Sequence, residues 1–186
     1  MHFVQWTAPE VSESAYEIPQ GSLLKALEDI ENGLFPLLNN PKRWESIDID
    51  YHPPRVERVF MQQAELRVSL HCIHPCPAKG ALFHPHPWPS AMRILSGRYE
   101  MAVGFGPGKE TPPISLTLVS KAGSAYEMIH PNAWHSVRPI GKPVMTLMIS
   151  GKPWKRIAPR SAKSLPHLSG DRKGEILTAF KEFYKR

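Results

Sequence analysis

Proline limits the folds open to this chain more than any other residue type does. There are 20 prolines in 186 residues, and most of them lie between positions 53 and 139. Because proline has no amide hydrogen to donate, it is excluded from central strands and from helix interiors. The middle of the chain is therefore expected to consist of short elements joined by rigid connections.

The segments between these prolines have the apolar spacing of short β-strands. Residues 66–72 alternate apolar and polar side chains, which is typical of a half-buried strand. Short strands separated by glycine and proline favour a sandwich or barrel over alternating β and α units. Further strands are expected at 92–95, 99–103, 114–119, 125–129 and 144–149, with a tight turn at Ser96-Gly97.

Both ends of this central region have helical patterns. From Ser22 to about Asn40, leucine and isoleucine recur at helical spacing behind a serine that can cap the helix, and Pro36 is expected to end it or to begin a second turn. Residues 171–184 are also amphipathic. We therefore expect one all-β domain over residues 1–186, with a helical lead-in at 1–63, the antiparallel β region at 64–151, and a basic segment and helix at 152–186.

Composition and charge exclude several classes of function. The net charge is +6, but the basic residues are scattered apart from a cluster at 152–163, which argues against nucleic-acid binding. No apolar run approaches the ~20 residues of a membrane-spanning helix, and the N-terminus lacks the pattern of a secretory signal. We expect a cytoplasmic protein that binds neither nucleic acid nor membrane, and whose mild basicity favours anionic small molecules.

Three of the nine histidines have the spacing of metal ligands. His84 and His86 are two residues apart, so in a strand their imidazoles point to one face and can reach a single ion at ~2.0–2.1 Å. His135 follows a turn-like Pro-Asn sequence and begins another expected strand. An H-x-H pair alone is weak evidence, and the surrounding sequence gives it weight.

The sequence around these histidines resembles the two motifs of the cupin superfamily. His84-Pro-His-Pro-Trp-Pro-Ser-Ala-Met-Arg-Ile-Leu-Ser-Gly97 resembles the first motif, H-x-H-x3-E-x6-G, and His130-Pro-Asn-Ala-Trp-His135 resembles the second, P-x-G-x2-H-x3-N. The resemblance covers roughly residues 64–151. It implies a small antiparallel β-barrel or jelly roll that holds one divalent transition metal inside on His84, His86 and His135.

The departures from these motifs narrow the implied chemistry. Ser90 stands where the family has a glutamate ligand, and Asn132 stands where the second motif has glycine, at a position expected to need positive φ. A site without the carboxylate is similar to that of the three-histidine cupin dioxygenases, which include the thiol dioxygenases. It implies Fe(II), O₂ and a small chelating substrate whose negative charge replaces the missing carboxylate.

A thiol substrate is disfavoured within that class. Some thiol dioxygenases carry a cysteine shortly after the H-x-H pair, cross-linked to a tyrosine, whereas this chain has Ser90-Ala91-Met92 there and Trp154 near the place of the tyrosine. Two alternatives stay open: a metal-dependent isomerase or epimerase using zinc, nickel or manganese, and a non-catalytic cupin that binds a small ligand.

Several other residues are candidates for the same site. Tyr99 could supply a hydroxyl to the pocket, and His130 could be a fourth ligand, a hydrogen-bond partner of His135 or a cap on its turn. Either arginine on an expected strand could bind a substrate carboxylate, and the tryptophans beside the proposed ligands could wall the pocket. These substrate-binding candidates are Arg67, Arg138, Trp88 and Trp134.

The two cysteines form a second Cys/His cluster. Cys72, His74 and Cys76 could bind zinc, but the favoured interpretation is a buried reduced cysteine at a strand end followed by a second cysteine in the turn. His74 shares strand parity with Cys72, so it is expected either near the H-x-H pair or as a hydrogen-bonded core residue. A homodimer is expected too, because the edge strands of a small barrel need covering unless the N-terminal helix does so.

Overall fold

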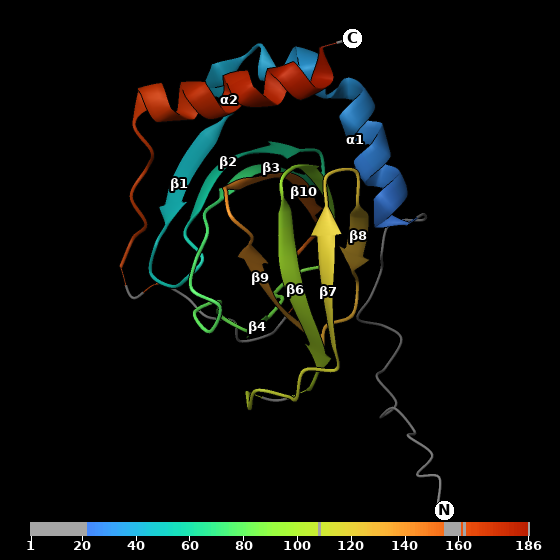
Figure 1. Cartoon of the computed structure of the whole chain (residues 1–186). Coiled ribbons are helices and arrows are strands. Elements are labelled where there is room, and N and C mark those ends of the chain that lie inside the picture. The colour runs from blue at the N-terminus through green and yellow to red at the C-terminus, as the bar shows by residue number, and fades with distance from the viewer. Residues whose placement is uncertain (1–21, 108, 155–160, 162, 186) are drawn as a thin grey trace, which may run out of the picture.

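Two β-sheets and two helices make up the structure, a computed structural model that describes residues 22–107, 109–154, 161 and 163–185 (Figure 1). Every strand pairing is antiparallel, as expected. Neither helix of the described residues is long and apolar enough to cross a membrane. The elements in chain order are α1 (Leu23–Leu38), a 3-10 turn (Pro41–Arg43), β1 (Glu45–Ile49), β2 (Val56–Gln63), β3 (Leu66–Ile73), β4 (His84–Pro85), β5 (Ser90–Ser96), β6 (Arg98–Phe105), β7 (Leu116–Lys121), β8 (Ala125–Met128), β9 (Ala133–Pro139), β10 (Val144–Ser150) and α2 (Gly170–Tyr184).

The strands form one sheet of six and one of four. The larger sheet has the order β1-β2-β3-β10-β5-β8, and the smaller has the order β4-β9-β6-β7. A cavity between the two is lined by side chains from both. The expected all-β fold with helices at both ends is confirmed at this level. The two sheets are not joined by hydrogen bonds, however, so the expected closed barrel is not formed.

The larger sheet begins before the segment expected to be β-rich. Strands β1 and β2 lie within residues 45–63, which were assigned to a helical lead-in, and β2 pairs with β3 along its whole length. Its buried positions alternate as Glu57, Val59 and Met61. A glutamate on the apolar face hid this alternation, because charged residues are rarely buried without a partner.

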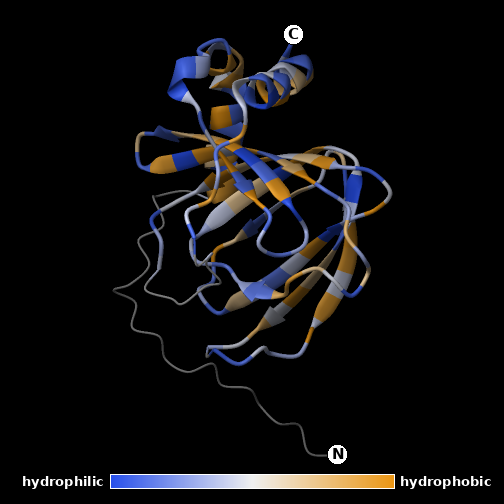
Figure 2. Cartoon of the chain, turned by 90° about the vertical axis from the view of Figure 1, so that its left-hand side faces the viewer, coloured by the Kyte–Doolittle hydropathy of each residue, from blue (hydrophilic) through white to orange (hydrophobic). Residues whose placement is uncertain are grey.

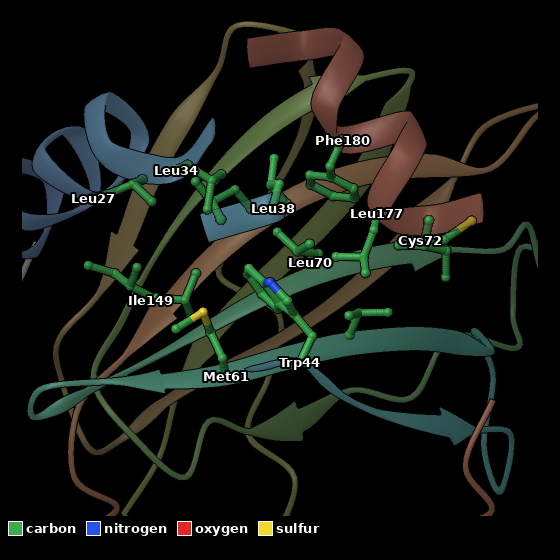
Figure 3. Close-up of a cluster of buried hydrophobic side chains, with 14 of the residues drawn as sticks. Leu27, Leu34, Leu38, Trp44, Met61, Leu70, Cys72, Ile149, Leu177 and Phe180 are labelled. Carbon is green, nitrogen blue, oxygen red and sulfur yellow. The ribbon is translucent and has the colours of Figure 1, made fainter. Parts of the chain in front are cut away.

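The helices cover the outer face of the six-stranded sheet. Leu27, Leu34, Leu177 and Phe180 on the helices lie in one buried cluster with side chains of β2, β3 and β10 (Figure 3). The hydropathy colouring shows hydrophobic residues on both helices and along the strands (Figure 2). At ~25 cal/mol per Å² of buried apolar surface, such a cluster is a main source of stability.

This layer decides which face of β3 looks into the cavity. Val68, Leu70 and Cys72 pack into the helix-covered cluster, whereas His71 and Ile73 line the cavity. Of the two positions expected for His74, the structure therefore shows the hydrogen-bonded one, on the Cys72 face and 2.8 Å from Glu57, and not the one near the H-x-H pair. The most apolar face of the strand contacts the helices, and the inner face carries the polar groups of the cavity.

Local sequence signals explain how several elements begin and end. Ser22 accepts a hydrogen bond from the amide of Leu24 at the start of α1, as expected of an N-cap. The helix continues through Pro36 to Leu38, so the proline does not end it. Gly97 turns the chain from β5 to β6 with φ of +76°, and a Cβ there would lie 3.0 Å from the side chain of Val144.

Candidate metal centre and its cavity

The three predicted histidine ligands meet on the smaller sheet. His84 on β4 is the direct register partner of His135 on β9, and His86 follows β4 with its amide bonded to the carbonyl of Ala133. Strand β4 lies at the edge of its sheet. An edge strand tolerates proline because one side of it needs no amide donors, so Pro85 is accommodated there between the two proposed ligands.

The ring of His135 is spaced from each of the other two rings as imidazoles around one ion would be. The ring centroid of His135 is 4.8 Å from that of His84 and 4.9 Å from that of His86. Imidazoles bound to a single ion at ~2.0–2.1 Å have centroids roughly 4.5–5.5 Å apart when the ligand angles are near 90–110°. The observed separations lie within this range.

Backbone carbonyls fix the orientation of two of the rings. Nδ1 of His84 donates to the carbonyl of Leu82 at 2.9 Å, and Nδ1 of His86 donates to the carbonyl of Trp88 at 2.7 Å. Because a carbonyl oxygen only accepts, both Nδ1 atoms carry the hydrogen and both Nε2 atoms keep the lone pair that a metal requires. Such an anchored imidazole is the usual arrangement of metal-binding histidines.

The third ring is buried without a complete set of partners. Nδ1 of His135 has no hydrogen-bond partner among the described residues. A buried polar nitrogen normally has one, so this ring retains capacity to bind a ligand. The serine that replaces the family's glutamate, Ser90, lies 3.3 Å from Nδ1 of His86, on the edge of that ring already bonded to Trp88.

Burial keeps the three imidazoles neutral. It lowers the pKa of His84, lowers that of His86 to about 4, and lowers that of His135 well below its usual value. All three rings are therefore uncharged at neutral pH, which is the form that binds metals. Their donor set and electrostatic state fit one divalent transition metal.

A second group of candidate ligand atoms lies outside the cavity, on the helix-covered face. Atoms of Glu57, Cys72 and His74 all lie within 4.8 Å of one another. Both oxygens of Glu57 already accept hydrogen bonds from Arg172, at 2.9 and 2.6 Å, and His74 contacts the same carboxylate at 2.8 Å. Burial raises the pKa of Cys72 to about 11, so this thiol stays protonated.

Of the two groups, the three histidines suit a metal better. The guanidinium of Arg172 occupies the carboxylate of Glu57 and would repel a divalent cation, and a protonated thiol is not a ligand. The Glu57 group is an ion-pair network in which Arg172 of α2 binds Glu57 of β2, and it attaches the helix to the sheet. The zinc alternative for Cys72, His74 and Cys76 therefore lacks the free donors it needs, and Cys76 is not a member of this group. The favoured interpretation fits, since Cys72 is a buried free cysteine at the end of β3 and Cys76 is a free cysteine beyond it.

The histidines open into a cavity of about 580 Å³. This volume lies within the usual range for small-molecule sites. The wall is mostly apolar and aromatic, and it includes the indoles of Trp88 and Trp154. Further lining residues are Ile47, Ile49, Val56, Ile73, Met92, Val137 and Met148.

One cation on this wall was not predicted from the sequence. Arg58 on β2 lines the cavity, and its Nε donates a hydrogen bond to Nε2 of His71 at 2.9 Å. Burial lowers the pKa of Arg58 to about 10, so it stays charged at neutral pH. The alternation of Val56, Arg58 and Phe60 opposite Glu57 and Val59 could have indicated its inward direction, had β2 been recognised as a strand.

Neither predicted arginine lines this cavity. Arg67 lies over the ring of Phe60, 5.3 Å from its centroid, beside a separate small pocket. Arg138 pairs with Glu100 at 3.3 Å on the other sheet. Arg58 is the arginine that lines the cavity among the described residues.

The two predicted tryptophans occupy different environments. Trp88 lines the cavity and packs edge-on against His86, with the ring centroids 5.8 Å apart. Trp134 is buried beside Phe83 and donates from its indole to the carbonyl of Gly106. Only Trp88 of this pair lies on the cavity wall.

The weak catalytic candidates lie outside the cavity lining. Tyr99 is fully buried and donates to the hydroxyl of Tyr126 at 2.7 Å. His130 accepts a hydrogen bond from the amide of Asn132 and so caps the turn before β9. Asn132 does not have the positive φ expected of it, since Ala64 is the non-glycine residue with positive φ among the described residues. The hydrogen bond from the amide of Asn132 to Nδ1 of His130 stabilises this turn without a positive φ at Asn132.

Comparison with known proteins adds solved structures of low similarity. No protein-family profile and no curated protein matches the chain. Hydroxypropylphosphonic acid epoxidase from S. wedmorenis aligns with a TM-score of 0.47 and 12% identity over 60% of this chain and 56% of that one. A putative sugar phosphate isomerase from Acidithiobacillus ferrooxidans aligns with a TM-score of 0.39 and 17% identity over 52% and 60%.

Crystal structures of DMSP lyases also match, with a TM-score of 0.37 and 21% identity over 53% of this chain and 45% of that one. The chain spans a little over half the length of the epoxidase structures it matches. Similarities of this size establish no family. The class that fold and site define is an antiparallel two-sheet protein with a buried histidine cluster opening into a cavity.

Proposed function

We propose that this chain is a cupin-type metalloenzyme, a mononuclear non-haem Fe(II) dioxygenase that acts on a small chelating substrate. Its ligands are His84, His86 and His135. The observation that carries the proposal is the set of three buried neutral imidazoles, two of them anchored through Nδ1 to backbone carbonyls. That arrangement presents lone pairs to the cavity without any carboxylate.

The donor set favours oxygen chemistry. Three neutral ligands leave a divalent ion with its full charge and several open positions, and Fe(II), when bound, supplies adjacent positions for substrate and O₂. The chain contributes the geometry: β4 and β9 hold the imidazoles, and the carbonyls of Leu82 and Trp88 keep two of them from rotating. The apolar wall around Trp88 excludes water from the substrate.

The first test is metal analysis of protein purified without a metal-binding tag. We expect one iron per chain after anaerobic reconstitution with Fe(II), and O₂ uptake when chelating substrates are added. His86→Ala should lose the metal, because it removes a ligand while leaving the sheet packing intact. The matched control is His167→Gln, which changes an exposed histidine that does not line the cavity, and glutamine can still donate to the carbonyl of Ser46 that this ring contacts.

Each outcome bears on a different part of the proposal. Full metal occupancy in His86→Ala would refute the ligand assignment. Stoichiometric zinc or nickel without O₂ uptake would replace the dioxygenase with a Lewis-acid isomerase. The absence of any stoichiometric metal, even after anaerobic Fe(II), would overturn the metalloenzyme itself.

A further inference from the structure

Arg58 has no acidic partner among the described residues, whereas most of the other arginines that form side-chain hydrogen bonds do. Arg93, Arg138 and Arg172 pair with Glu31, Glu100 and Glu57. The partner of Arg58 is the neutral imidazole of His71, and no ion pair involving Arg58 is formed within the described residues. A partly buried guanidinium without a counter-ion is unfavourable, and it is kept where a ligand supplies the anion.

The neighbouring residues hold this guanidinium without neutralising it. Arg58, His71 and Thr146 are successive register partners across β2, β3 and β10. Because Nε2 of His71 accepts from Arg58, its Nδ1 carries the hydrogen, which points to Oγ1 of Thr146 at 3.4 Å. Burial and the nearby Arg58 both lower the pKa of His71, which keeps it an acceptor. His71 accepts from Nε of Arg58, and no hydrogen bond to either Nη group is formed within the described residues, so both Nη groups can contact a ligand.

The cavity wall supplies no acid of its own. Among the described residues that line it there is neither aspartate nor glutamate, whereas Arg58 and Lys163 are both present. Apart from these charges and the histidines the wall is mostly apolar, with Ile47 and Ile49 on the neighbouring strand β1 and Val56 on the same strand as Arg58. This composition disfavours an organic cation and favours a molecule with one anionic end and an apolar body.

We infer that the cavity binds a small organic carboxylate, whose oxygens contact the Nη groups of Arg58 and whose apolar body lies against Ile47, Ile49 and Val56. A carboxylate matches the planar edge of a guanidinium. His71 is the positioning residue of this subsite. That the bound molecule is also the substrate rests on the proposed function; the anion subsite itself does not.

The experiment measures carboxylate binding in metal-free protein by calorimetry, with hexanoate as the probe and hexanamide as its uncharged match. We expect hexanoate to bind and hexanamide to bind roughly tenfold to a hundredfold more weakly, because only the carboxylate makes charged hydrogen bonds. Arg58→Gln should reduce hexanoate affinity by the same factor. Arg98→Gln, which removes an exposed arginine of β6, should leave it unchanged.

Equal binding of hexanoate and hexanamide to the wild-type protein would overturn the inference, and that comparison needs no variant to fold. Unchanged hexanoate affinity in Arg58→Gln would overturn it as well. Inorganic phosphate binding as tightly as hexanoate, and depending on Arg58, would replace the carboxylate with a bare oxyanion.

The two proposals can fail separately. Carboxylate binding that depends on Arg58 in a protein that never takes up metal would leave the subsite standing and remove the metalloenzyme. Metal uptake with O₂ consumption but no preference for hexanoate over hexanamide would do the reverse.

Discussion

Nε of Arg58 donates a hydrogen bond to Nε2 of His71, its direct register partner on the neighbouring strand. The bond is 2.9 Å long and lies on the inner face of the six-stranded sheet, in the cavity that the three histidines share. This bond fixes the orientation of the charged guanidinium of Arg58 through the neutral imidazole of His71. Arg58 is near enough to His86 for its charge to contribute to the lowered pKa of that ring, so the cation and the proposed metal ligands act on the same space.

A substitution of His71 that removes the hydrogen-bond acceptor should weaken carboxylate binding more than one that keeps an acceptor. His71→Leu leaves Nε of Arg58 without a partner and should reduce hexanoate affinity roughly tenfold. His71→Gln keeps an acceptor oxygen and should retain affinity to within roughly twofold, since a neutral hydrogen bond is preserved. Calorimetry on both variants tests this, with thermal unfolding to show that each is folded. Equal losses in the two variants would contradict a positioning role.

The ion-pair network under α2 should make stability depend on acid pH. Hydrogen bonds from Arg172 lower the pKa of Glu57 from 4.5 to about 2. The unfolded chain therefore takes up this proton at higher pH than the folded one, so the stabilisation is complete above about pH 5 and is lost as pH falls toward 2. The shift corresponds to about 3 kcal/mol.

Urea unfolding at a series of pH values measures this dependence. Glu57→Gln should be less stable than the wild type at neutral pH and about equally stable near pH 2, where the wild-type carboxylate is protonated as well. A stability difference that stays constant from pH 7 to pH 2 would show that the charge of Glu57 is not its origin.

The C-terminal helix should be an integral part of the fold. Phe180 is fully buried against the sheet, whereas Phe183 on the same helix is 41% exposed. Phe180→Ala should lower the free energy of unfolding by about 3–5 kcal/mol through the cavity it creates. Phe183→Ala, the matched control, should cost less than about 1 kcal/mol. Similar losses from both, measured by urea unfolding, would argue against this packing.

A buried pair of tyrosines should show energetic coupling. The hydroxyl of Tyr99 donates to that of Tyr126 at 2.7 Å, and Tyr126 in turn contacts the sulfur of Met92 at 3.1 Å. Tyr99→Phe and Tyr126→Phe should each cost about 1–2 kcal/mol, since each leaves the other hydroxyl with only the weak acceptor sulfur of Met92. The double variant should cost less than the sum by about 1 kcal/mol. Strict additivity in the cycle would mean that the two hydroxyls do not interact.

Much of the β structure could be predicted from local patterns. The alternation in residues 66–72 corresponds to β3, and the predicted strands at 92–95, 99–103 and 144–149 lie within β5, β6 and β10. These succeed because period-two alternation follows from strand geometry alone. The strand expected at 114–119 is found two residues later, as β7, beyond a proline-rich connection.

Strand β2 was missed from the sequence because its pattern depends on a partner that is distant along the chain. Glu57 is buried because Arg172, on a helix more than 100 residues away, supplies its counter-ion, and no local pattern contains that information. The same kind of information decides which face of β3 points to the cavity, and so two positions stayed open for His74, because α1 and α2 cover the more apolar side of that strand. The sequence spacing did select His84, His86 and His135, which the structure brings to one cavity, while their role as ligands stays a prediction.

The prolines that flank the ligands affect how the site forms. Pro85, Pro87 and Pro89 alternate with His84, His86 and Trp88 from the edge strand β4 through the connection that leads to β5. Because a proline ring already restricts φ in the unfolded chain, this segment loses less conformational entropy on folding than an ordinary loop would. Two of the three imidazoles are thus held before any ion arrives. Ion binding should then require little reordering of the backbone, so that apo and loaded protein differ mainly in the mobility of their side chains.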